Sequence, residues 1–310
     1  MTKEKSDNSL TEKDVSFDDL PKRKRLLNPK QSQKIGYSML LSSIIFIVIV
    51  LGVFLGYIII NGLKSINFKF IFSSYNPTVG RYGLFPSIMG TFLLIIGSIA
   101  IAAPLGLLAA IYLTEYTKGG IIVSIIDQGI NNLAGVPSVV IGVFGYALFS
   151  VYLKMGSSMI AAWLTLACML LPTIIRTSQE ALRSVPRTYR EGSFALGATK
   201  WRTIRYVVLP PALPGITTGI ILSLGRAAGE TAAVLFVGSG VFFNRFFNGF
   251  SGTFMNLPNF LLTLYRSAGG WEQVGDVMWL TAFVLILIVF SFNAVAIVIR
   301  NRSEKQRGSY

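Results

Sequence analysis

Two opposite charges stand four residues apart inside a stretch of the chain that is otherwise apolar. Arg226 and Glu230 both lie within residues 213–238. Residues four apart share one face of an α-helix, so the spacing predicts a helical ion pair. Placing an Arg at the centre of a bilayer costs about 2.5–3.5 kcal/mol on insertion scales. We therefore expect the pair to face protein or water instead of lipid.

The pair has two interpretations, and its spacing does not decide between them. In the first, the planar, permanently charged guanidinium of Arg226 binds a tetrahedral oxyanion, while Glu230 orients it and moderates its affinity. In the second, the two charges neutralise each other and lock helices together. A protonated phosphate can donate a hydrogen bond to a carboxylate and sulfate cannot, so Glu230 is compatible with an anion path.

The composition excludes several other chemistries. The chain has no His and one Cys, Cys168, which rules out a histidine base, the common kind of zinc site and an internal disulfide. The Gly192–Gly197 spacing is followed by Ala198 and Thr199 instead of the Lys and Ser or Thr of a phosphate-binding loop. We therefore expect no bound cofactor and no nucleotide site on this chain, and no enzyme activity of its own.

The elements that must position these residues are membrane helices. Only 14% of the 310 residues are charged and 52% are hydrophobic, which indicates a polytopic membrane protein. We predict an all-α fold with six apolar spans, at residues 35–60, 86–113, 130–153, 159–175, 213–238 and 277–299.

The distribution of basic residues predicts the orientation of these spans. Of the 28 Lys and Arg, 21 fall in the two tails and in the 114–129 and 176–206 loops, which all lie on one side. The positive-inside rule places these segments in the cytosol and the chain in a bacterial cytoplasmic membrane. A basic run at residues 22–25 anchors this topology and is compatible with contact with membrane lipid, and we expect no nucleic acid as partner.

Residues 176–206 are polar enough to lie outside the bilayer and patterned enough to be ordered. Residues 178–182 and 188–196 have the apolar spacing of short amphipathic helices, with breaks at Pro186 and Gly197. Small residues around Gly192 and Gly197 allow another surface to come close. A helix pair of this kind between two spans predicts a docking site for a partner protein.

The spacing in this segment resembles the coupling motif of ABC importer permeases. Glu191, Gly192 and Ser193 are followed after three residues by Gly197, and after nine more by Val207, Val208, Leu209 and Pro210. The family motif has Ala-Ala where this chain has Gly-Ser, and Ile where it has Val207. The resemblance implies that residues 176–210 of this chain, the coupling segment, fit a cleft on an ATP-binding subunit. The coupling residues that it implies are Glu191, Gly192, Gly197, Ala198, Leu209 and Pro210.

Longer stretches narrow the resemblance to the phosphate-specific ABC transporter permeases, with the A-type subunit matching better than the C-type. The stretches that carry it are residues 132–138, 171–177, 181–186, 195–201 and 224–231. The resemblance associates Arg226, Glu230 and Arg176 with the phosphate pathway. Arg176 has a second explanation, because an Arg at the inner end of a span also fixes topology.

The resemblance also implies an organisation and a set of partners. Residues 84–300 would form the permease domain, half of a pore, preceded by a polar tail at 1–34 and a first span with its external loop at 35–83, and followed by a tail at 301–310. The implied partners are a C-type phosphate permease subunit as heterodimer partner, two copies of the ATP-binding subunit that use ATP and Mg, and an extracytoplasmic phosphate-binding protein. Two rival functions remain open: an importer permease for sulfate or molybdate, and a stand-alone secondary transporter or channel.

Overall fold

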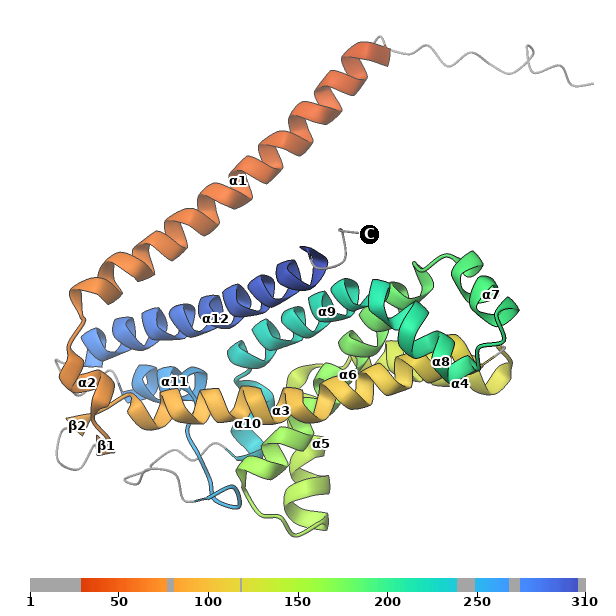
Figure 1. Cartoon of the computed structure of the whole chain (residues 1–310). Coiled ribbons are helices and arrows are strands. Elements are labelled where there is room, and N and C mark those ends of the chain that lie inside the picture. Colours follow the sequence, from red (N-terminus) through yellow and green to blue (C-terminus); the bar gives the residue numbers. More distant parts are fainter. Residues whose placement is uncertain (1–28, 77–80, 118, 239–248, 268–273, 306–310) are drawn as a thin grey trace, which may run out of the picture. The chain divides into compact units, whose positions relative to one another are not determined.

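The computed structural model describes residues 29–76, 81–117, 119–238, 249–267 and 274–305. The contacts within the chain divide it into two units, Met1–Leu55 and Gly56–Tyr310. The first unit contributes most of one long helix, and the second contains every other element (Figure 1). Most of the polar tail predicted at 1–34 lies outside the described residues, and its last six residues belong to the first helix.

The regular secondary structure of the described residues is helical apart from one pair of two-residue strands, β1 and β2, which run antiparallel. The elements in chain order are α1 Pro29–Lys64, α2 Phe68–Phe72, β1 Tyr75–Asn76, β2 Arg81–Tyr82, α3 Phe85–Ile111, η3 Tyr112–Tyr116, α4 Ile121–Ala134, α5 Ser138–Gly145, η4 Tyr146–Tyr152, α6 Met159–Arg183, α7 Arg187–Ala195, α8 Lys200–Thr203, η5 Ile204–Val208, α9 Leu209–Gly229, α10 Ala232–Val237, α11 Leu257–Ser267 and α12 Val274–Lys305. The segments η3, η4 and η5 are π-helical.

Five stretches of helix in the described residues are long and apolar enough to cross a membrane: α1, α3 with η3, α6, α8 through α9, and α12. A sixth crossing is present if the bent pair α4 and α5–η4 counts as one span. The prediction of an all-α polytopic membrane protein is confirmed. Along α1 the side chains are apolar on every face, as a helix surrounded by lipid or by other membrane helices requires.

The third span is not the continuous helix predicted at 130–153. The chain bends by 105° between α4 and α5, at residues 135–137. Pro137 explains the bend, because the ring of a proline clashes with a helical conformation at the preceding residue. Residues 121–129, which we predicted as loop, form most of α4 instead, and α4 packs its Val123 and Ile130 on the rest of the unit.

The fourth span is longer than predicted. We expected residues 178–182 to form a separate short helix, but α6 runs unbroken to Arg183. Its 25 residues extend over about 37 Å, more than the roughly 30 Å of a hydrocarbon core. Its last turns therefore reach past the apolar layer, toward α7. The predicted amphipathic helix at 188–196 is confirmed as α7, with its ends at the predicted breaks.

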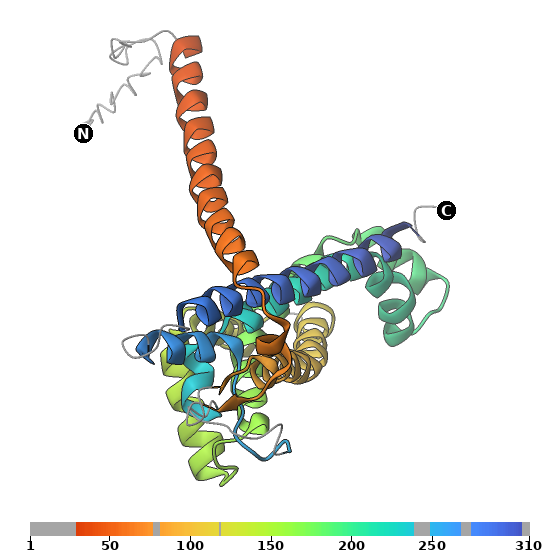
Figure 2. The same cartoon turned by 90° about the vertical axis from the view of Figure 1, so that its left-hand side faces the viewer.

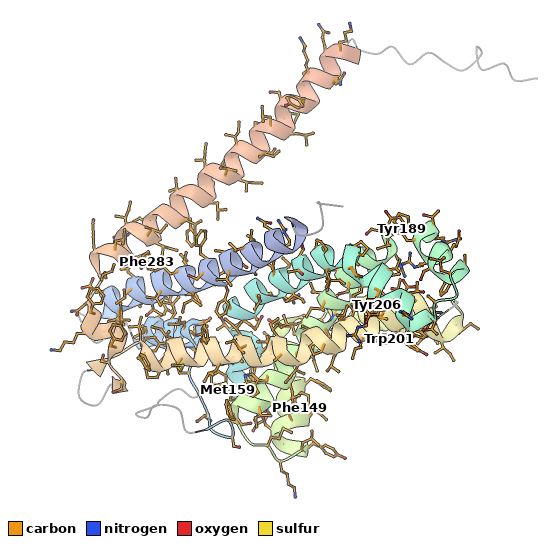
Figure 3. The ribbon with its side chains drawn as sticks, viewed as in Figure 1. Phe149, Met159, Tyr189, Trp201, Tyr206 and Phe283 are labelled. Atoms are coloured by element: carbon orange, nitrogen blue, oxygen red, sulfur yellow. The ribbon has the colours of Figure 1, made fainter. Side chains whose placement is uncertain are left out.

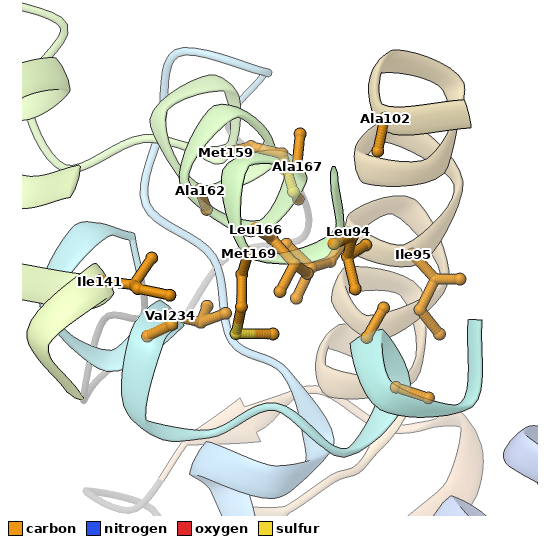
Figure 4. Packing of buried hydrophobic residues seen from close by; sticks show 14 of the residues in the cluster. Leu94, Ile95, Ala102, Ile141, Met159, Ala162, Leu166, Ala167, Met169 and Val234 are labelled. Carbon is orange, nitrogen blue, oxygen red and sulfur yellow. The ribbon is translucent and has the colours of Figure 1, made fainter. Parts of the chain in front are cut away.

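The main apolar core lies between α3 and α6, with α5 and α10 closing its other side (Figure 4). Gly97 of α3 brings the two long helices together, because its Cα faces the indole ring of Trp163 on α6. The indole Nε1 of Trp163 donates a hydrogen bond to the Leu93 carbonyl, 3.0 Å away. A side chain at position 97 would occupy the space of that ring.

A second core lies at the α7 end of the helices and joins η3, the end of α6, η5 and the start of α9. Pro210 and Pro211 at the start of α9 have no N–H to donate to the carbonyls of Tyr206 and Val207. The wider π-helical turn η5 lies at these same residues and accommodates the mismatch.

Figure 2 shows α9 and α12 side by side, as does Figure 1.

We expect Gly97→Val to loosen the packing of α3 on α6. The added methyl groups must displace the Trp163 ring, and overpacking of this kind costs about 1–3 kcal/mol. The measurement is thermal unfolding of the purified protein in detergent, followed by size-exclusion chromatography. Gly129→Val is the matched control, because it makes the same change in a helix at a position with no neighbour within 4 Å. Equal unfolding temperatures for the two variants would contradict the role given to Gly97.

Candidate functional site

Arg226 lies in the last turn of α9 and is exposed. In the described part of the chain its guanidinium forms no ion pair and no hydrogen bond with another side chain. A positive charge in the last turn interacts favourably with the carbonyl end of the helix dipole. The planar fork nevertheless keeps all its donors available to a further group.

The predicted helical pair of Arg226 and Glu230 is wrong. The α9 helix ends at Gly229, and Glu230 has an extended backbone, with φ −73° and ψ 122°. No ion pair joins the two side chains, both of which are described. The predicted fifth span, 213–238, is therefore broken at residues 230 and 231, and the six-residue helix α10 follows.

Glu230 serves the backbone at this break. Its Oε1 accepts a hydrogen bond from the Ala233 N–H at 3.1 Å, in the first turn of α10, where helices lack internal acceptors. The carbonyl of Glu230 accepts a hydrogen bond from Asn256 Nδ2 at 3.2 Å. Irregular backbone at membrane depth is tolerated only inside protein or beside water, so the break marks a protein-lined or wet region.

Arg176 differs from Arg226 because its fork is occupied. Its Nη1 is 2.8 Å from Asp127 Oδ1 and 2.7 Å from Gln179 Oε1, and its Nη2 donates to the Asp127 carbonyl at 2.6 Å. These bonds attach α4 to α6. The structure therefore brings Arg176 together with Asp127, and not with the residues at the α9 break.

Four of the six predicted coupling residues lie in α7 or the turn after it, and three of these, Glu191, Gly192 and Gly197, are exposed (Figure 3 labels Tyr189 and Trp201 in the same segment). Gly197 has a φ of +78°, a conformation that other residues adopt only with strain. Its N–H donates to the Phe194 carbonyl and the next N–H to the Ser193 carbonyl, which is the Schellman ending of a helix. Leu209 and Pro210 lie apart from this turn, at the start of α9.

One further interaction, an ion pair between Arg190 of α7 and Glu115 of η3, was not predicted from the sequence. Arg190 Nη2 is 2.6 Å from Glu115 Oε1, and its Nε lies 3.2 Å from both carboxylate oxygens. The pair joins residues 75 positions apart, so no local spacing could predict it. It borders a cavity of about 770 Å³ whose lining includes Asp127, Arg183 and Glu191.

No group of three or more acidic or Cys side chains in the described residues has a geometry that could hold a metal ion.

The chain is similar to known proteins over most of its length. Residues 102–307 match the family described as binding-protein-dependent transport system inner membrane component. The phosphate transport system permease protein PstA 1 of Mycobacterium tuberculosis is 37% identical over 227 residues, which cover 73% of both chains. The probable ABC transporter permease protein YqgI of Bacillus subtilis is 35% identical over 68% of this chain and 71% of its own, and PstA of Pasteurella multocida is 32% identical over 76% and 84%.

Solved structures show the same fold. A chain of a bacterial alginate ABC transporter, in complex with an alginate-bound periplasmic protein, aligns with a TM-score of 0.64 over 86% of this chain and 93% of its own, at 15% identity. A chain of the inward-facing MetNI methionine ABC transporter aligns with a TM-score of 0.52 over 74% and 99%, at 22% identity. Both likenesses concern the arrangement of the helices.

We expect Arg176→Met and Arg226→Met to differ in their effect on stability. The first leaves the buried Oε1 of Gln179 without its donor and removes both Arg176 bonds to the partly exposed Asp127, which costs about 1–3 kcal/mol, whereas the second breaks no bond in the described residues. Hydrogen exchange of the purified protein should rise along α4 only in Arg176→Met. Similar exchange along α4 in both variants would show that Arg176 does not hold this helix.

Proposed function

Because the chain belongs to the family of binding-protein-dependent transport system inner membrane components, we propose that it is the membrane permease subunit of an ATP-driven importer of inorganic phosphate. The observation that carries the choice of cargo is the 32–37% identity, over about three quarters of the chain, with proteins named phosphate transport system permeases. The chain would form half of the translocation pore.

Arg226 is the residue that we assign to the phosphate ion. Its exposed guanidinium has no partner within the described residues, and a guanidinium binds two phosphate oxygens side by side through charge-assisted hydrogen bonds. An Arg already held in an ion pair would have to exchange partners at each transport cycle. Arg226 requires no such exchange, and water in the pore can solvate it between ions.

Glu230 acts beside Arg226 through the helix break. Its carboxylate holds the first turn of α10, which fixes where the backbone opens next to Arg226. A carboxylate near the path can accept a hydrogen bond from protonated phosphate and repels fully ionised sulfate. Arg176 is the weaker pathway candidate, because its Nη1 and Nη2 are held by Asp127 and Gln179.

The remaining subunits follow from the coupling segment. We place α7 and both termini in the cytosol, in agreement with the distribution of Lys and Arg, and assign α7 to the cleft of an ATP-binding subunit. Two such subunits would hydrolyse ATP with Mg, a C-type permease would form the other half of the pore, and an extracytoplasmic phosphate-binding protein would deliver the ion. This chain needs no cofactor of its own for that role.

We expect Arg226→Gln to abolish transport without loss of stability. No ion pair within the described residues is broken, so the subunit should assemble and bind its ATPase as the wild type does, while phosphate uptake falls at least tenfold because the cationic fork is absent. The measurement is uptake of labelled phosphate into proteoliposomes, normalised to assembled complex. Arg226→Lys keeps the charge without the fork and should give intermediate uptake.

The double variant Arg226→Gln/Glu230→Gln separates this role from charge neutralisation. If the two residues served only to neutralise each other, uptake would return when both charges are removed. We expect it to stay as low as in Arg226→Gln, and near-normal uptake by the double variant would reject Arg226 as an anion ligand.

We expect Glu191→Lys and Gly197→Trp to leave the subunit inserted in the membrane and to uncouple it from the ATPase. Glu191 is exposed on α7, and any side chain at Gly197 strains its left-handed turn. The measurements are membrane insertion by fractionation, ATPase co-purification in mild detergent and phosphate uptake. Normal uptake with normal co-purification would show that α7 is not the docking element, and wild-type protein that recruits no ATPase would favour a secondary transporter.

A further inference from the structure

The α7 helix has no buried residue, so apolar packing does not hold it on the membrane helices. Phe194, its largest apolar side chain, is 47% exposed. A cavity borders α7 on one side and is lined there by Arg187, Glu191 and Phe194. The position of α7 must therefore depend on a small number of polar contacts.

Arg190 makes most of these contacts. Its Nη2 and Nε bind the carboxylate of Glu115, and the side chains of the two residues are only 16% and 8% exposed. Its Nη1 donates to the Val185 carbonyl at 2.7 Å, and its Nη2 donates to the Leu182 carbonyl at 2.9 Å. One guanidinium thus joins α7 both to the end of α6 and to η3, the continuation of α3.

Two weaker contacts reinforce the attachment to η3. The Lys200 ammonium lies 4.9 Å from the centre of the Tyr116 ring, one residue beyond Glu115, in a cation–π contact that ties α8 to the same end of α3. The hydroxyls of Ser193 and Thr203 are 2.8 Å apart and connect α7 to α8. Together α7 and α8 form a unit that contacts η3, the continuation of α3, although α6 and η5 are its neighbours in sequence.

We infer that Glu115 and Arg190 are a positioning pair that transmits displacement of α7 to α3. The inference rests on the proposed function, and names the membrane helix that responds when the ATPase moves α7. The charged fork tolerates little shear, because hydrogen bonds weaken steeply with misalignment. A displaced α7 must therefore draw the end of α3 along or break the three hydrogen bonds between Arg190 and Glu115 at once.

The test uses the reconstituted importer with its ATP-binding subunit, second permease and binding protein. In Glu115→Gln and Arg190→Gln, we expect the ATPase to remain bound and basal ATP hydrolysis to persist, while phosphate uptake and stimulation of hydrolysis by the loaded binding protein fall at least tenfold. Arg190→Lys should retain about a third of the uptake. The matched control is Arg183→Gln, an exposed Arg on the border of the same cavity that makes no hydrogen bond or ion pair in the described residues, and it should be unaffected.

A covalent link distinguishes transmission from simple stability. In a Cys168→Ala background, Glu115→Cys/Arg190→Cys should be uncoupled when reduced, and a short bis-methanethiosulfonate cross-linker should restore at least a third of the wild-type stimulation. Complete cross-linking without restored stimulation would overturn the inference. If the glutamine variants fail to assemble, Glu115→Asp, which shortens the side chain by one methylene, gives the same comparison, and normal stimulation in it would also overturn the inference.

Hydrogen exchange separates this inference from the proposed cargo. Addition of ATP to the wild-type complex should change the exchange of α7 and η3 together, whereas in Glu115→Gln only α7 should respond. This readout needs no phosphate. If α7 and η3 change together in a wild-type complex that takes up no phosphate, the inference about Glu115 and Arg190 stands and the proposed cargo is wrong. If the exchange of η3 does not change in the wild type, the inference about the pair is wrong.

Discussion

The close contact of α3 with α6 is the constraint on which the rest of this structure depends. Gly97 lets the Trp163 ring lie against the α3 backbone, and the indole N–H binds the Leu93 carbonyl. With the two helices in this register, their far ends, η3 and the last turns of α6, meet at the second core. Arg190 finds its carboxylate and carbonyl partners only because these two ends lie next to each other.

Hydropathy and spacing were sufficient to predict the spans and the position of α7. They were insufficient to predict the bend between α4 and α5 and the break after α9. The bend before Pro137 had a visible signal, which the high apolar content of residues 130–153 outweighed in our interpretation. The break at Glu230 had none, because the capping of α10 by the Glu230 side chain depends on where the backbone turns. The i, i+4 argument for an ion pair assumed that α9 continues through Glu230. The helix ends one residue before it, at Gly229.

Three arginines show why residue type alone could not assign the site. Arg176 and Arg190 each hold two elements together, and Arg226 has no partner in the part of the chain that is described. The sequence ranked Arg226 above Arg176, and the two differ in the structure because only Arg176 is held by side chains of neighbouring residues. Arg190 escaped notice because its partner, Glu115, is distant in sequence and belongs to a segment that we had predicted as loop.

Because α7 has no buried side chains, its surface and the membrane core are under different constraints on their sequence. Substitutions at exposed positions usually change folding stability by no more than about 0.5 kcal/mol. The exposed side chains of α7 can therefore change without loss of folding stability while the membrane core keeps its sequence, provided that Arg190 is kept. If α7 docks a partner as proposed, related permeases that share this anchoring should be able to exchange their α7 surfaces, and with them their partner, without changes to the membrane helices.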